Sequence, residues 1–271
     1  MVESDNSNIS ISRQVELFDI SRASIYYTPK ANEEEKKIMG FIDKIYTKFP
    51  FYGSRRIKGE LEISYDIHIC REHTQNLMRL MGIEAVYPKK KFNLSQNRTS
   101  HKVYPYLLKD CLITKPNQVW GTDITYIKLE KGWAYLTAIL DWFSRYVIAW
   151  ELSETLESNF CIANLKKALE ISLPLFHNSD QGTQFTDKNY IEILKINKIQ
   201  ISMDGRGRCM DNIFTERLWR TVKYENIFLK SYRNATDARA GLKDYFKFYN
   251  TGRRHQSLNN QTPEFVYHNF K

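Results

Sequence analysis

Apolar residues recur at helical spacing near the start of the chain. Ile11, Val15 and Phe18 repeat three to four residues apart, and Ser21 is placed to cap a second short helix. Residues 12–30 therefore fit a small helix-turn-helix-like segment that contacts DNA, and they fit a helical hairpin that packs on its neighbour equally well. The pattern alone does not separate these two readings.

A second helical unit is expected over residues 31–85. Its first helix carries an apolar stripe made of Ile38, Phe41, Ile42 and Ile45. Another helix begins after Gly53, and a third covers 71–81 and ends at Gly82, a residue type that favours helix ends. This order is also typical of a helix-turn-helix. Three arginines are candidates for DNA contact, although a solvated helix face explains each one as well: Arg55, Arg56 and Arg79.

Between residues 86 and 115 the helical pattern stops, and aromatic residues alternate with cations. The segment holds seven Lys or Arg against one Asp, and Lys89, Lys90 and Lys91 are consecutive. Aromatic residues interleaved with cations favour a segment that lies along DNA phosphates over a merely solvated run. We therefore expect a basic linker between the helical unit and a larger domain at 116–271.

Beyond residue 116 the pattern changes to one of strands. Three segments rich in Trp, Tyr, Val, Ile and Thr predict strands joined as hairpins: 118–129, 133–140 and 145–152. Helices and strands then alternate, at 159–171, 174–177, 187–196 and 198–202. A further helix is expected up to Glu225 and another at 236–249. This order predicts an α/β fold, an RNase H-like mixed five-stranded sheet with flanking helices.

Composition adds a partner class to this picture. Hydrophobic residues make up 42% of the 271 residues, which is enough for a core, and the net charge of +9 favours a polyanionic partner such as DNA. The polar start and the lack of a long apolar run predict a cytoplasmic protein without membrane contact. The four cysteines form no CxxC pair, which argues against a disulfide framework or a zinc ribbon.

Three carboxylates fall at informative places in the predicted domain. Asp123 lies in the middle of the first strand, where Asp is normally avoided, and Asp180 follows the fourth strand beside Gly182. Glu216 lies on the last long helix, and Arg220 and Lys223 share its face within roughly 40°. Singly, each acid could be a turn residue or half of an ion pair. Together they suit two divalent cations, which cleave phosphodiesters with water as the nucleophile.

These acids lie in sequence motifs that resemble those of a known family. The spacing Asp123, Asp180, thirty-five residues to Glu216, then Lys223, resembles the DDE signature of insertion-sequence transposases related to retroviral integrases. The blocks PNQVWGTDITYI, LDWFSRYVIAW, HNSDQGTQF, CMDNIFTERLWRTVKYE and FYNTGRRHQSL follow in that family's order. FYGSRRI and LMRLMGIEAVYPKK extend the similarity upstream, so that it covers nearly the whole chain.

The resemblance implies a bacterial, nucleoid-associated enzyme that nicks the ends of its own element and joins the 3′-hydroxyl to another DNA. Asp123, Asp180 and Glu216 would bind two Mg²⁺ or Mn²⁺ ions, and Lys223 would contact the element end. Implied partners are terminal repeats, target DNA, further copies of the chain and an upstream-frame protein with a helix-turn-helix and a leucine zipper. We also expect a basic loop to reach DNA, through Arg253, Arg254 and His255.

Two other functions share most of these features. A structure-selective nuclease of the RNase H-like fold would cut DNA or hybrids without joining them. A non-enzymatic DNA-binding regulator, left by a decayed element, would have no magnesium-dependent activity. Only the transposase produces strand-transfer products when 3′-hydroxyl oligonucleotides are supplied.

Overall fold

The computed structural model describes residues 9–19, 21, 33–86, 104–205 and 212–270. The chain divides into two compact units, Met1–Val86 and Tyr87–Lys271, each of which has its own buried residues. Within the described residues no helix is long and apolar enough to cross a membrane.

Three packed helices make up the body of the first unit: α3 (Glu33–Lys48), α4 (Ser54–Tyr65) and α5 (Arg71–Leu80). Their apolar stripes meet in a small core in which Ile42, Ile57 and Leu61 are fully buried. Gly82, with a φ of +68°, follows the end of α5 in the left-handed region that glycine favours. The described part of the preceding segment contains α1 (Ile11–Leu17), capped by Ser10.

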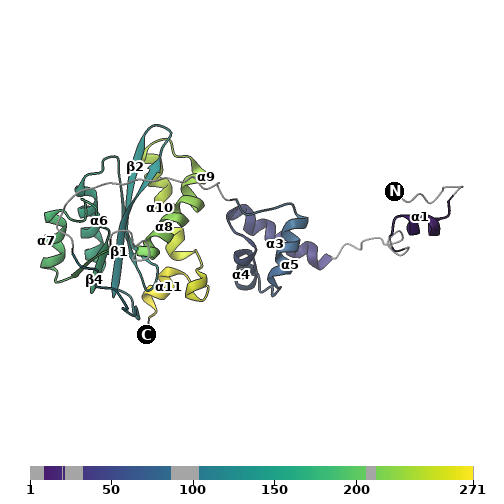
Figure 1. The fold of residues 1–271 in the computed structure, drawn as a ribbon, viewed down its shortest axis with the longest axis horizontal. Coiled ribbons are helices and arrows are strands. Elements are labelled where there is room, and N and C mark those ends of the chain that lie inside the picture. Colours follow the sequence, from purple (N-terminus) through teal and green to yellow (C-terminus); the bar gives the residue numbers. More distant parts are fainter. Residues whose placement is uncertain (1–8, 20, 22–32, 87–103, 206–211, 271) are drawn as a thin grey trace. The chain divides into compact units, whose positions relative to one another are not determined.

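The second unit is built on a mixed five-stranded sheet in the order β3-β2-β1-β4-β5 (Figure 1). Its strands are β1 (Val119–Lys128), β2 (Trp133–Asp141), β3 (Val147–Ser153), β4 (Phe176–Ser179) and β5 (Gln200–Met203). The first three pair antiparallel as a meander, whereas β4 and β5 join in parallel. This arrangement confirms the predicted α/β fold, with strand ends within two residues of those expected.

Helices cover both faces of the sheet, as Figure 1 shows. One face packs α6 (Ser158–Ile171) and α7 (Lys188–Ile196) over a core that includes Trp120, Leu165 and Tyr190. The other face packs α8 (Ile213–Val222) and α10 (Ala235–Thr251) over a core that includes Val119 and Leu218. Because neighbouring residues of a strand point to opposite faces, Val119 and Trp120 of β1 serve different cores.

The chain between and after these helices is irregular. A π-helical turn (η2, Lys223–Ile227) and the short α9 (Phe228–Lys230) continue α8 without a break. After α10 come a 3₁₀ turn (η3, Gln256–Leu258) and α11 (Pro263–His268). Thr262 caps α11 by accepting a hydrogen bond from the Phe265 amide.

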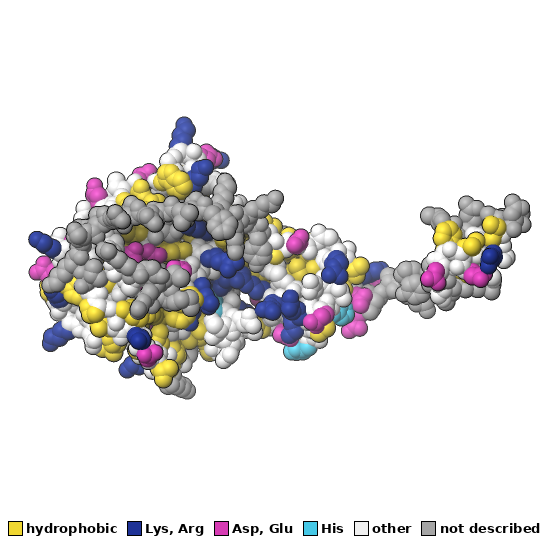
Figure 2. Space-filling model, viewed as in Figure 1, with side chains coloured by type: hydrophobic (Ala, Val, Ile, Leu, Met, Phe, Trp, Pro, Cys, Tyr) yellow, Lys and Arg dark blue, Asp and Glu magenta, His cyan; other side chains and the backbone are white. Residues whose placement is uncertain are grey.

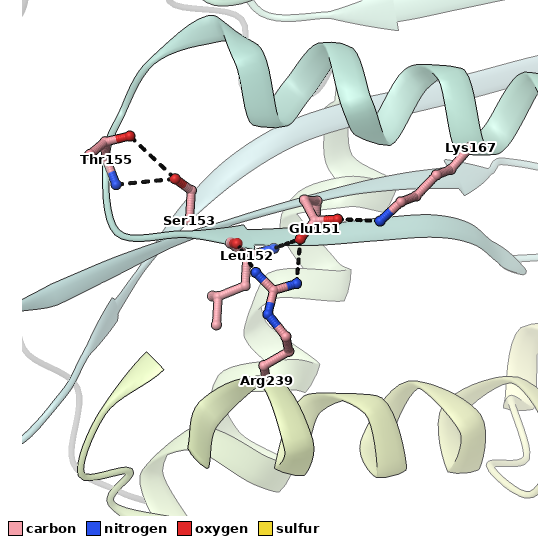
Figure 3. A network of polar contacts seen from close by, with 6 residues as sticks. All are labelled: Glu151, Leu152, Ser153, Thr155, Lys167 and Arg239. Carbon is pink, nitrogen blue, oxygen red and sulfur yellow. Dashed lines mark hydrogen bonds and ion pairs between the residues drawn. The ribbon is translucent and has the colours of Figure 1, made fainter. Parts of the chain in front are cut away.

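Strand β3 is tied to a helix on each face through one acid (Figure 3). The Glu151 carboxylate pairs with Lys167 of α6 and with Arg239 of α10. Arg239 also donates to the Leu152 carbonyl, and the Leu152 amide donates to Glu151 at 3.2 Å. The pairing lowers the pKa of Glu151 although its partial burial acts in the opposite direction. Glu151 therefore fixes an edge of the sheet against both helical layers.

Candidate active site

Asp123 lies in the middle of β1, opposite Ala138 of β2, on the face covered by α8. The Trp219 indole of α8 donates a hydrogen bond to its Oδ2 at 3.0 Å, and the Ile124 amide donates to Oδ1 at 2.7 Å. These bonds fix the carboxylate in one orientation. Two residues earlier, the missing side chain of Gly121 makes room for Trp142, whose Nε1 would lie 2.1 Å from a Cβ built there.

Asp180 directly follows β4, the strand that pairs in parallel with β1. Its Oδ1 accepts a hydrogen bond from the Gly182 amide at 2.9 Å. A Cβ on Gly182 would lie 2.8 Å from this oxygen, so the glycine leaves space for the carboxylate. Although the residue lies at the surface, desolvation of its carboxyl raises the pKa of Asp180.

The charge of Asp180 acts on Asp123. Burial is the largest cause that raises the pKa of Asp123 to about 7, and the negative charge of Asp180 raises it further. Asp204, which follows β5, adds a smaller effect of the same sign. Figure 2 shows acidic side chains (magenta) gathered on the face of this unit that is drawn.

Asp204 was missed by the sequence reasoning. It accepts a hydrogen bond from Asn178 Nδ2 at 2.7 Å, and the Gln181 side chain donates to its carbonyl at 2.8 Å. The signal was available, because Asp204 follows a parallel strand at the edge where Asp180 follows its neighbour. Side chains at the carboxyl ends of parallel strands commonly meet at one edge of an α/β sheet.

Glu216 lies on the first turn of α8 and is exposed. Partial desolvation raises its pKa, and no effect of Asp123 or Asp180 on it is found. Within the described residues, no three His, Cys, Asp or Glu side chains are close enough to hold one metal ion. The structure therefore brings two of the three expected acids together and leaves Glu216 one helical turn from Trp219, the residue that binds Asp123.

The start of α8 is tied to the sheet by Asn212. Asn212 precedes the helix but makes no side-chain cap to it, and its carboxamide donates to the Thr122 carbonyl at 3.4 Å instead. Asp211, the residue before it, lies outside the described residues. Asn212 thus ties the start of α8 to β1, next to Asp123.

Two cations were expected to share the helix face of Glu216. Lys223 is half-buried, and burial lowers its pKa overall although the Asp123 carboxylate acts to raise it, which places the ammonium near that acid. Arg220 is exposed, with its guanidinium 5.7 Å from the Tyr224 ring centre. Lys223 opens the π turn η2, a feature that is frequent at functional sites.

The structure gives Arg253 a different role from the one expected. It is 5% exposed, and its guanidinium donates to Glu225 from Nε at 2.7 Å and from Nη2 at 2.8 Å. Tyr245 donates to the same carboxylate at 3.0 Å, and Arg253 Nη1 lies 2.9 Å from His255 Nε2. Arg253 is therefore part of the core, and the expectation that it reaches DNA from a basic loop was wrong.

The remaining candidates for DNA contact lie at different depths. Arg254 and His255 are half-buried, and Arg254 donates to the Asn260 carbonyl at 3.3 Å. Arg55 and Arg79 are exposed, and Arg56 stacks 5.3 Å from the Tyr52 ring centre. Lys89, Lys90 and Lys91 lie outside the described residues.

Comparisons with known proteins agree with this architecture. Two models of the integrase core domain match residues 113–209 and 197–263, and a model of an HTH-like domain matches 32–91. The chain is 30% identical over 261 residues to the insertion element IS600 uncharacterized 31 kDa protein of Shigella sonnei, covering 92% of this chain and 95% of that one. It is 29% identical to the putative transposase InsK of IS150 from Escherichia coli K12, over 90% and 89%.

A solved structure extends the agreement to the fold. A chain from the simian T-cell lymphotropic virus intasome, in complex with the PP2A regulatory subunit B56 gamma, superimposes with a TM-score of 0.51. The match covers 85% of this chain and 75% of that one at 15% identity, which supports a shared fold alone.

Proposed function

Because the chain belongs to the insertion-sequence transposases of the DDE integrase superfamily, we propose that it nicks DNA at the ends of its element and transfers the 3′-hydroxyl strand into target DNA. The observation that carries this proposal is the pairing of Asp123, fixed in the middle of β1, with Asp180 at the end of the adjacent parallel strand. That position is the one where ligands of α/β sheets collect.

The acidic pair suits divalent cations. Carboxylate oxygens are the hard ligands that Mg²⁺ and Mn²⁺ prefer. The pKa of Asp123 is raised mainly by burial and further by the charges of Asp180 and Asp204, and a bound cation would offset both effects. When bound, two such ions would activate the attacking oxygen and stabilise the leaving one. Asp123 and Asp180 would hold them, with Glu216 as the third ligand.

The other residues of the site position the carboxylates and the DNA. Trp219 and the Ile124 amide orient the Asp123 oxygens, and the Gly182 amide orients Asp180. Pre-set ligands of this kind need not reorganise when a cation arrives. Lys223, near Asp123, would bind a phosphate of the element end, and Arg220 would extend this contact along the exposed face of α8.

Partners follow from the same proposal. The helical unit that contains Arg55, Arg56 and Arg79 would bind the terminal repeats, and Arg254 and His255 would touch DNA from the far end of the chain. We also expect the basic residues Lys89, Lys90 and Lys91 to contact phosphates. Several copies of the chain would assemble on DNA. The upstream-frame zipper protein would supply a further DNA-reading module.

The test is a strand-transfer assay with the purified full chain, Mg²⁺ and a duplex carrying the element end. The wild type should nick the duplex and join its 3′-hydroxyl to a target plasmid, and Asp180→Asn should lose both steps. Glu192→Gln, on the exposed face of α7, is the matched control and should keep both. Cleavage without joined products would point to a structure-selective nuclease, and binding without either step to a regulator.

The identity of the third ligand has its own test, because Asp204 also acts on Asp123. Glu216→Gln should abolish strand transfer, whereas Asp204→Asn should reduce it by no more than about tenfold. The reverse result would assign the third position to Asp204 and remove Glu216 from the site.

A further inference from the structure

A groove of about 670 Å³ opens beside the start of α8 and is separate from the acidic pair. Four parts of the second unit form its walls: residues 106–113, the turn between β2 and β3, the first residues of α8, and the stretch 257–266. Most of the wall is apolar and includes Leu108, Trp142 and Phe214. A cavity of this size suits one small flat ligand group.

One cation lies in this apolar wall. The Arg145 guanidinium carbon is 3.5 Å from the centre of the Phe214 ring, so the two groups stack as a single platform. Arg145 Nη1 is buried and has no hydrogen-bond partner in the described part of the chain. The negative charge of Asp141 attracts Arg145, but the hydrogen bonds to the Asp141 carboxylate come from Asn117 and Ser144.

Arg145 Nη1 is therefore an unpaired donor behind the wall of the groove, in the described part of the chain. No Asp or Glu is among the residues that line the groove. A buried donor left without a partner is costly, and Arg145 also holds a left-handed backbone, with a φ of +62°. A flat ligand would instead use the plane of the guanidinium, by stacking on it.

Polar side chains also line the groove. Ser257, Asn259 and Gln261 line it from the segment between η3 and α11. Carboxamides both donate and accept hydrogen bonds, as the edge of a nucleobase requires. Asn259 has a φ of +53°, a conformation that Asn tolerates better than most residues.

We propose that this groove binds one unpaired nucleotide of a DNA strand, with the base stacked on the Arg145–Phe214 platform and its edge against Asn259 and Gln261. Unstacked bases are bound in this way, on aromatic rings or guanidinium planes. Phe214 precedes Glu216 by two residues, so the nucleotide would lie next to the proposed catalytic helix. An apolar side chain from a second copy would fill the groove but would give the Asn259 and Gln261 carboxamides no hydrogen-bonding partner.

This inference rests on the proposed action on DNA and is tested without catalysis. The full chain is titrated in EDTA with a blunt duplex and with a forked duplex of the same sequence, which has 2-aminopurine at the unpaired position. We expect about tenfold tighter binding of the fork and quenching of 2-aminopurine, as stacking of one base provides. Asp180→Asn should keep this preference, so that a failure of catalysis is seen separately.

The variants separate stacking from charge. Arg145→Lys keeps the cation at the same backbone position but removes the plane, so the fork preference should be lost while blunt-duplex affinity changes less than about twofold. Asn259→Gly keeps the left-handed backbone and removes the carboxamide, and the preference should fall to about threefold. Asn260→Gly is the matched control, because Asn260 has a φ of +60° but does not line the groove, and it should bind like the wild type.

Four results would overturn the proposal. The first is equal binding of fork and blunt duplex by the wild type, and the second is an unchanged preference in Arg145→Lys. The third is a changed association state of Asn259→Gly in sedimentation with no change in DNA preference, which would assign the groove to a protein contact. Competition by free deoxyadenosine monophosphate at micromolar concentration would instead make it a free-nucleotide site and would also refute a DNA strand as the ligand.

Discussion

Replacing Arg253 by Met should lower the unfolding free energy of the second unit by much more than is usual for a residue in a basic surface loop. The Arg253 and Glu225 side chains are 6% and 5% exposed, and two hydrogen bonds of 2.7 and 2.8 Å join them. The substitution would remove the cation and both of these hydrogen bonds from the buried Glu225 carboxylate, to which Tyr245 also donates. Breaking a buried pair in this way costs about 3–5 kcal/mol of unfolding free energy.

Urea denaturation followed by tryptophan fluorescence measures this cost. All five tryptophans lie in the second unit, so the signal reports on its unfolding alone. Arg254→Met is the matched control: Arg254 is half-buried and donates to a backbone carbonyl, and its loss should cost less than about 1 kcal/mol. Glu225→Gln combined with Arg253→Met should cost less than the sum of the single variants, because the residues are in contact.

DNA binding distinguishes the structural role from the one first expected. Below its unfolding transition, Arg253→Met should bind duplex DNA within about twofold of the wild type, since the guanidinium is not at the surface. A stability loss under about 1 kcal/mol, together with DNA binding weakened more than tenfold, would refute the buried-pair reasoning.

Three further outcomes are expected. Folding raises the pKa of Asp123 from 3.8 to about 7, so ionisation of its carboxyl destabilises the metal-free fold as the pH rises through this window. In urea denaturation with EDTA at pH 8, Asp123→Asn should therefore be about 1–3 kcal/mol more stable than the wild type. At pH 3.5 the two proteins should be equally stable. Lys223→Ala should lower the salt slope of element-end binding by about 1 in a filter-binding series. Glu151→Ala should cost about 1–2 kcal/mol in urea by freeing β3 from two helices, whereas the exposed Glu154→Ala should cost nothing measurable.

The strands of the sheet were predicted well because each one is marked by its own local residue pattern. The segment expected at 118–129 forms β1 at Val119–Lys128, and its alternation places Val119 and Ile127 in one core and Trp120 in the other. The acid in the middle of this strand was likewise visible as a residue out of place. Its hydrogen bond from Trp219, ninety-six residues away, depends on how α8 packs and has no local signal.

Long-range pairing explains what the sequence did not predict. The helix expected to run to Glu225 changes to a π turn at Lys223, and the turn buries Glu225 and Asn226 toward α10 and Tyr232. Helical periodicity contains no information about the partner of Glu225, since Arg253 lies twenty-eight residues further on. The same pairing made an apparently basic loop residue part of the core.

Titration with Mn²⁺ tests most directly whether Asp123 and Asp180 form a cation site. Calorimetry on the purified full chain should show saturable Mn²⁺ binding to the wild type and to Glu192→Gln, and no binding to Asp123→Asn or Asp180→Asn. Unchanged Mn²⁺ binding by both aspartate variants would contradict the proposed site.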